Sequence, residues 1–225
     1  MRKLIPLVVL TATFCMGASC SISWDGPDTG VPLDQADCTM RIAENSTEAT
    51  VSAEITTRLG FPVELDEDRS VLVNDQALTR EGGTSRYAAK IPVADTYVVT
   101  VIEPTRGVET TSQAAPPDFS ILSPTDGGTA SLSGLAVLWS NPDAPLRAVI
   151  VLSQVLFGET QQLTAGPLAD GGNRSFGAAD LARFRQGADL TITVTKTVQR
   201  TGINGFDSGR LSIERSRLIR IQPRS

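Results

Sequence analysis

The chain has no histidine among its 225 residues, only three cysteines and few aromatic residues (5%). Without histidine there is no Ser-His-Asp or Cys-His nucleophile system, and no histidine-ligated zinc or haem site. The cysteines form no C-x-x-C pair, which excludes a thioredoxin-type redox centre. The P-loop, G-x-G-x-x-G and G-x-S-x-G motifs are missing as well. The sequence therefore predicts a protein that is not an enzyme and carries no cofactor or metal.

Charge is distributed unevenly around a formal net value of −5. Residues 35–115 carry 13 acidic and 7 basic side chains, whereas residues 116–225 carry 9 and 11. Because a nucleic-acid-binding domain is clearly cationic, neither half predicts a nucleic-acid partner. An acidic front half and a faintly basic back half instead favour two domains of separate character.

The N-terminus has the pattern of a targeting signal. Two basic residues precede the apolar stretch Leu4–Phe14, whose 11 residues are too few to span a bilayer but suit a secretory signal. Small residues at 17–19 then lead directly to Cys20. This pattern resembles the lipobox of bacterial lipoproteins, although Gly17 stands where the family usually has an aliphatic residue. The resemblance implies that residues 1–19 are removed as a signal peptide and that lipidated Cys20 binds the membrane.

The residue at position 21 indicates in which membrane the lipidated protein lies, and Cys20 leaves a second route of processing open. In the enterobacterial members of the family, Asp after the lipidated cysteine favours the inner membrane, and Ser21 therefore favours the outer membrane. The alternative is ordinary secretory cleavage after Ser19, which would let Cys20 and Cys38 form a disulfide. If Cys20 is lipidated, Cys38 is a lone thiol, and we expect it to be a small apolar core residue.

Apolar residues recur with the period of two that is typical of half-buried strands. Val51, Ala53 and Ile55 alternate with polar residues, and the run 190–198 alternates apolar residues with threonines. The sequence predicts an all-β protein with two tandem Ig-like, antiparallel β-sandwich domains. The predicted division is a lipid-anchored flexible tether (20–36), a first sandwich (37–110), a linker (111–117) and a second sandwich (118–225).

Two local features lie in the second predicted domain. A short helix is expected over 178–184, before the threonine-rich strand. The apolar phase breaks between Ile213 and Leu218, which predicts a bulge or a short turn there.

The second domain opens with a recognisable run of residues. It consists of Pro117, Phe119, Ile121, Pro124, Gly127, Leu135, Val137, Trp139 and Ser140. The run resembles the opening of fibronectin type III and related Ig-like domains, where a proline leads the first strand and a tryptophan lies in the early core. The resemblance covers residues 117–157 and implies an architecture, not an activity.

An acidic cluster and one lysine are candidate sites in the sequence. The cluster consists of Glu64, Asp66, Glu67 and Asp68. Its carboxylates suit calcium, but the spacing of a calcium loop is missing, which favours an exposed acidic hairpin turn. Lys196 continues an apolar strand face near its end, and we expect it to extend its ammonium group into water at the rim.

Arginines are concentrated near the C-terminus. Arg210, Arg215, Arg217 and Arg220 form a candidate patch for an anionic partner. The alternative is a solvated strand face that protects a sheet edge, which the interruption by Glu214 favours.

These observations predict a non-enzymatic, lipid-anchored protein of the bacterial cell envelope, at the outer membrane. Its two β-sandwich modules would bind an envelope protein or a polysaccharide. The alternative is a secreted carbohydrate- or ligand-binding sandwich, which would need exposed aromatic side chains. The candidates, Tyr87, Tyr97 and Trp139, mostly fall on predicted core faces, and Trp24 lies in the tether.

Overall fold

The computed structural model of the protein describes residues 31–66, 68–82 and 84–224. Its regular secondary structure is nearly all β-strand, in mostly antiparallel sheets that form an all-β sandwich fold, which confirms the predicted class. One short helix, α1 (Ala178–Leu181), lies inside the stretch where the sequence predicted a helix. A single 3₁₀ turn, η1 (Leu33–Gln35), precedes the first strand. No helix among these residues is long and apolar enough to cross a bilayer.

The largest element is a nine-stranded sheet, which we call the shared sheet. Its order is β13-β12-β15-β16-β1-β2-β6-β5, and β10 pairs with the end of β16. Its strands are β1 (Ala36–Glu44), β2 (Glu48–Thr57), β5 (Thr79–Arg80), β6 (Arg86–Pro92), β10 (Thr129–Ser131), β12 (Arg147–Leu156), β13 (Glu159–Ala169), β15 (Leu190–Thr201) and β16 (Ser208–Arg224).

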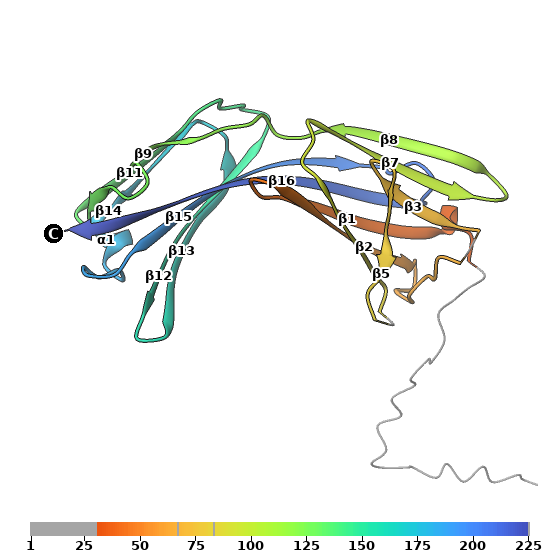
Figure 1. Ribbon diagram of the computed structural model, residues 1–225, viewed down its shortest axis with the longest axis horizontal. Helices are drawn as coiled ribbons and strands as arrows, with labels where there is room; N and C mark the ends of the chain where they lie inside the picture. The colour runs from red at the N-terminus through yellow and green to blue at the C-terminus, as the bar shows by residue number, and fades with distance from the viewer. Residues whose placement is uncertain (1–30, 67, 83, 225) are drawn as a thin grey trace, which may run out of the picture.

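Two smaller sheets cover the shared sheet on one side, and each defines a lobe. The first lobe has the sheet β4-β3-β7-β8 and the second has β14-β11-β9. Figure 1 shows both small sheets in the upper layer and the shared sheet in the lower layer. Their strands are β3 (Ser70–Val73), β4 (Gln76–Ala77), β7 (Thr96–Glu103), β8 (Gly107–Ala114), β9 (Ile121–Ser123), β11 (Gly134–Trp139) and β14 (Asn173–Gly177).

A long hairpin, β15–β16, runs through both lobes (Figure 1). The two strands pair without a register shift from Leu190 opposite Ile221 to Thr201 opposite Arg210. The first half of β16 also pairs in parallel with β1, and its end pairs with β10 in the second lobe. The lobes therefore share backbone hydrogen bonds along one strand in addition to the connection between β8 and β9.

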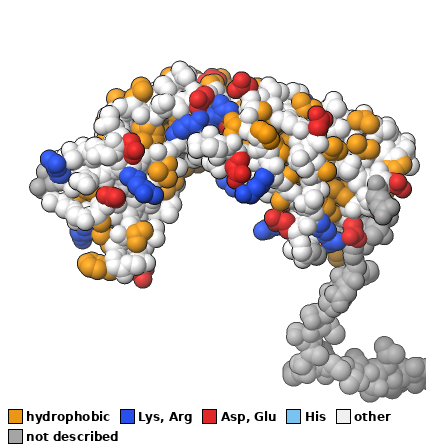
Figure 2. Space-filling model, viewed as in Figure 1, with side chains coloured by type: hydrophobic (Ala, Val, Ile, Leu, Met, Phe, Trp, Pro, Cys, Tyr) orange, Lys and Arg blue, Asp and Glu red, His pale blue; other side chains and the backbone are white. Residues whose placement is uncertain are grey.

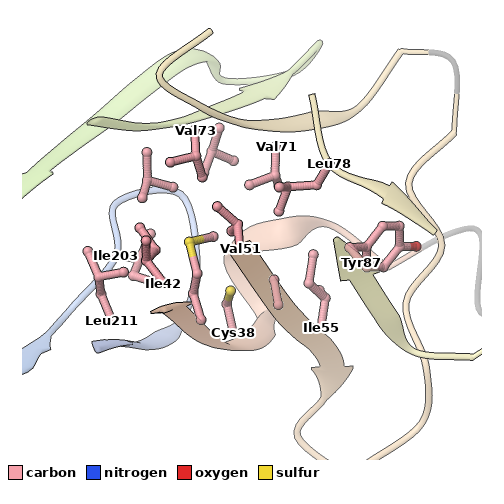
Figure 3. Close-up of a cluster of buried hydrophobic side chains, with 14 of the residues drawn as sticks. Cys38, Ile42, Val51, Ile55, Val71, Val73, Leu78, Tyr87, Ile203 and Leu211 are labelled. Atoms are coloured by element: carbon pink, nitrogen blue, oxygen red, sulfur yellow. The ribbon is translucent and has the colours of Figure 1, made fainter. Parts of the chain in front are cut away.

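Each lobe encloses its own hydrophobic cluster. The first cluster draws residues from 33–101 and, after a long separation in sequence, Ile203, Leu211 and Ile213 (Figure 3). The second cluster includes Phe119 and Trp139 and extends to residue 221. Residues 203–213, which the sequence division placed in the second domain, therefore contribute to the first lobe. Residues 111–114 of the predicted linker likewise belong to β8.

The predicted bulge in the last strand is wrong. Along β16 the odd-numbered positions face inward without interruption, and Leu218 points outward with 55% of its surface exposed. Arg215 and Arg217 occupy the inward positions between Ile213 and Ile219. The apparent break in phase arose because charged side chains stand on the buried face where β16 passes from one lobe to the other.

Candidate functional site

Three cations lie on the inward face of the hairpin, between the two hydrophobic clusters. They are Lys196 on β15 and Arg215 and Arg217 on β16, and we call them the junction cations. Lys196 stands directly opposite Arg215 in the register. Each cation has a carboxylate partner from another part of the chain: Asp170, Glu44 and Asp118, respectively. Two of the four arginines in the predicted patch, Arg215 and Arg217, are thus paired within the molecule.

Arg215 and Glu44 form a buried ion pair whose side chains are 3% and 0% exposed. Arg215 donates to both carboxylate oxygens of Glu44 and, at 3.3 Å, to the carbonyl of Ala94. The Tyr97 hydroxyl donates to Glu44 Oε1 at 2.7 Å. Burial, and then this bond to Glu44, raises the pKa of Tyr97 above its usual range. The group joins β1, β7 and β16 at the inner end of the first lobe.

Lys196 is fully buried, so the prediction that it lies at the rim is wrong. Its ammonium group donates to Asp170 Oδ2 at 3.0 Å and to the carbonyls of Ser140 and Asn141 at 3.1 and 2.5 Å. It also lies 4.6 Å from the centre of the Phe119 ring. Because all three donors of the ammonium have acceptors, the geometry favours a charged, structural lysine and not a nucleophile.

Asp170 completes this buried group. Trp139 Nε1 donates to Asp170 Oδ1 at 2.6 Å, and the backbone N–H of Asp143 donates to Oδ2 at 3.1 Å. Burial pushes the pKa of Asp170 upward, but the bonds from Trp139, Lys196 and Asp143 outweigh it and hold the pKa below its usual range. The tryptophan of the fibronectin-like run therefore anchors a carboxylate as well as filling the core.

The four C-terminal arginines do not form one patch. Arg210 and Arg220 are exposed on the outer face of β16, whereas Arg215 and Arg217 lie on its inner face. Arg217 binds the Asp118 carboxylate and donates to the carbonyl of Phe119 at 3.1 Å. The four arginines are divided between two faces because neighbouring odd and even positions of a strand point to opposite faces.

The acidic turn is also neutralised locally. Glu64 pairs with Arg80 at 2.8 Å, and Asp66 pairs with Arg69 at 2.9 Å. Glu67 lies outside the described residues. Among the residues that the structure describes, no group of three or more Cys, Asp or Glu is arranged to hold a metal ion.

Of the two cysteines that follow the predicted signal peptide, Cys38 lies within the described residues. Cys38 is buried and unpaired in the first cluster, as predicted, and burial raises the pKa of its thiol to about 12. Cys20 and Trp24 lie outside the described residues, as do the predicted signal peptide and most of the tether.

The outer face of the shared sheet is rich in hydroxyl groups. Thr191, Thr193, Thr195 and Thr197 follow one another on the outer side of β15, and each is partly exposed. Across the strands, Ser153 stands opposite Thr191 and Ser216 opposite Thr195, with 2.9 Å between the Thr195 and Ser216 hydroxyl oxygens. We call the four threonines with Ser153 and Ser216 the hydroxyl face.

The hydroxyl face continues into the first lobe with little net charge. Arg41 on β1 and Glu214 on β16 bind each other through two hydrogen bonds of 2.8 and 2.6 Å. Thr39 and Ser52 extend the row of hydroxyls over β1 and β2. Figure 2 shows that the molecule is hollowed between the lobes on this side. The hollow therefore presents hydroxyl donors and acceptors over several neighbouring strands, flanked by Arg220 opposite Thr191 and by Arg147 opposite Thr197.

The aromatic residues considered for sugar stacking are placed in the cores. Tyr87, Tyr97 and Trp139 are each no more than 3% exposed. The fully exposed Phe157 stands at the turn between β12 and β13. The sequence identified neither Phe157 nor the threonines as functional, although the alternation of the threonines with apolar residues in the run 190–198 was visible.

A scan against models of known protein families finds no match to this chain, and a search of curated proteins also finds none. The functional interpretation accordingly depends on the residues themselves.

Proposed function

We propose that this protein is a non-enzymatic, lipid-anchored protein of the bacterial cell envelope that binds an extended, uncharged segment of a protein or polysaccharide. The observation that carries the binding part is the hydroxyl face, which follows one strand of a sheet common to both lobes. Hydroxyl groups both donate and accept hydrogen bonds, so a regular array of them suits a neutral polar chain.

The anchor rests on the sequence. Small residues before Cys20 follow an apolar stretch of secretory length, as in the lipobox of bacterial lipoproteins. The Gly-, Pro- and Asp-rich stretch 21–36 is suited to a spacer between the membrane and the first lobe. Ser21 favours the outer membrane.

The architecture of the second lobe supports the Ig-like part of the proposal. Its sheets have the orders β14-β11-β9 and β13-β12-β15-β16. Leaving aside the three-residue β10, which pairs with the end of β16, strands one, two and five in chain order lie in one sheet and strands three, four, six and seven in the other, as in fibronectin type III sandwiches. Such sandwiches are widely used as binding modules, which fits a presenting role but identifies no partner.

The anchor is tested by labelling cells with clickable palmitate and fractionating the membranes. The wild type should carry label in the membrane fraction, and Cys20→Ala should lose both the label and the membrane association. An unlabelled wild type would refute the anchor and make the Cys20–Cys38 disulfide the next bond to test.

The binding face is tested by photo-crosslinking in intact cells. A photoreactive amino acid at Thr193 should form a discrete adduct with a protein or polysaccharide. The matched control is Thr100, a partly exposed threonine on the outer side of β7 in the small sheet of the first lobe. Equal adducts at both positions, or none at Thr193, would refute binding at the hydroxyl face.

The secreted sugar-binding alternative loses support, because three of its candidate stacking residues, Tyr87, Tyr97 and Trp139, are buried. Substituting Tyr87 or Tyr97, which both lie in the first cluster, would report on folding and not on ligand binding.

A further inference from the structure

The shared sheet ends in a long open edge. Strand β13 pairs only with β12 and has 11 residues, whereas β5 at the opposite end has two. Natural proteins usually protect such edges with charged residues or proline. The stretch 160–165 of β13 contains neither; its sequence is TQQLTA. This edge is therefore a candidate for pairing with another strand.

The register identifies the backbone groups that are free at this edge. Leu156 and Glu159 flank the two-residue turn between β12 and β13, and the pairing then continues residue by residue to Ile150 opposite Ala165, where the register shifts. Because residues in an antiparallel ladder alternate, the N–H and C=O groups of Thr160, Gln162 and Thr164 point away from β12. Arg183 Nη1 donates to the carbonyl of Gln162 at 2.8 Å, which agrees with this orientation.

The edge strand of the first lobe provides a contrast. Strand β8 ends the sheet β4-β3-β7-β8. Side chains from the β15–β16 hairpin occupy its outward carbonyls: Asn204 donates to Thr110 at 2.7 Å and Arg200 to Ser112 at 2.9 Å. On β13, the outward carbonyls of Thr160 and Thr164 have no such partner among the described residues.

We propose that two copies of this protein pair in antiparallel fashion through β13, with the two-fold axis at Gln162. In this register Gln162 stands opposite itself and Thr160 stands opposite Thr164 of the second copy. Three outward residues then form three hydrogen-bonded pairs, or roughly six backbone hydrogen bonds. A two-fold contact of this kind closes on itself, so it gives a dimer and not a fibre.

The side chains favour a second copy as the occupant. In a two-fold pairing a charged residue on the axis meets its own duplicate, and like charges directly opposite one another are destabilising. The stretch 160–165 is uncharged, and Glu159 stands opposite Ala165. The fully exposed Phe157 stands in the turn next to Glu159, at the end of the proposed pairing, where a second copy would remove part of its apolar surface from water.

Arg183 competes with this pairing. Its bond to the Gln162 carbonyl uses an acceptor that the second copy requires. Removing this side chain should therefore raise the fraction of dimer, whereas a contact that did not involve the β13 edge would be unaffected. The inference is independent of the lipid anchor and of any ligand at the hydroxyl face.

The test is disulfide trapping of the full protein in its own cells, with an oxidant added and dimers resolved without reductant. Residues opposite each other in a hydrogen-bonded pair have Cα atoms about 5.5 Å apart, within the range of a disulfide. Gln162→Cys should therefore crosslink to itself. Thr160→Cys should not, because its duplicate lies four residues away along the strand, roughly 13 Å. Co-expressing Thr160→Cys with Thr164→Cys should restore the dimer. The wild type gives the background from its native cysteines.

A second pair of variants tests the edge itself. Gln162→Pro in the Thr160→Cys and Thr164→Cys proteins removes an outward N–H while leaving the bonds to β12, and the dimer should be lost. Gln162→Lys, which places two like charges at the axis, should have the same effect without altering the backbone. Arg183→Ala should increase the dimer. Crosslinking of Gln162→Cys no greater than that of Thr160→Cys, or an unchanged dimer in Gln162→Lys, would overturn the proposal.

Discussion

Replacing Lys196 by methionine tests whether the junction cations stabilise the fold. Methionine keeps much of the length and apolar volume of lysine but removes the charge. The Asp170 carboxylate would stay buried with Trp139 and the Asp143 N–H but without a counter-charge. Removing one partner of a buried pair costs about 3–5 kcal/mol of unfolding free energy. For a chain of this size that lowers the unfolding midpoint by roughly 6–20 °C.

The measurement is urea and thermal unfolding followed by circular dichroism at pH 7. The matched control is Lys90→Met, because Lys90 pairs with Glu48 at 3.0 Å while its side chain is 72% exposed. An exposed pair of that kind contributes about 0–1 kcal/mol. If Lys196→Met costs no more than Lys90→Met, the reasoning about a buried, charge-paired lysine is refuted. A double variant that also changes Asp170 to Leu should recover part of the loss, since no unpaired charge then remains.

Three further predictions concern acid, thiol reactivity and one turn. Because the pKa of Asp170 is lowered in the folded state, its contribution to stability is complete above the unfolded-state pKa of about 3.9 and is lost as pH falls through the folded value. Urea unfolding from pH 5 to pH 2 should therefore show a shallower loss in Asp170→Asn, and equal slopes would contradict the assignment. The Cys38 thiol, whose pKa is raised to about 12, should not react with maleimide at pH 7 until denaturant is added. Mass analysis of the peptides can measure this labelling, and rapid labelling of Cys38 in the native protein would contradict its burial. Gly205 has φ +91°, and an added Cβ would lie 2.8 Å from Val101, so Gly205→Ala should cost about 1–3 kcal/mol. Gly202 has a similar φ of +84°, but an added Cβ there would meet nothing within 4 Å, so Gly202→Ala should lower the free energy of unfolding by less in the same assay. Equal losses of stability in the two variants would show that the contact with Val101 is unimportant.

Much of the strand pattern could be predicted because alternation is a local property. The run 190–198 predicted a half-buried strand, and β15 buries Leu190, Ile192 and Val194 as expected. Cys38 was placed correctly in the core for the same reason, since a small apolar side chain in a strand is suited to a sheet interior.

The pairing between distant segments could not be predicted in the same way. Arg215 and Glu44 are 171 residues apart, and neither neighbourhood indicates that the other lies beside it. Lysine and arginine side chains usually prefer solvent to an apolar environment. The sequence therefore predicts Lys196 at the rim of a sheet and Arg215 and Arg217 in a surface patch. A signal was nevertheless present: the odd positions of residues 211–221 continue in one phase if Arg215 and Arg217 are accepted as inward-facing.

The parallel pairing of β1 with β16 determines how the molecule would respond to a pulling force. β1 begins at Ala36, immediately after the stretch expected to lead to the membrane, and it runs beside β16 for eight paired positions. A pull on the N-terminal side draws β1 towards its start, while a load on the second lobe draws β16 towards its end. The two strands are then pulled in opposite directions along their common axis. All the hydrogen bonds between them resist together in shear, and none can open singly from one end as in unzipping. A protein tethered at one lobe and attached to a partner at the other would thus be loaded in the direction in which the hydrogen bonds between β1 and β16 resist together.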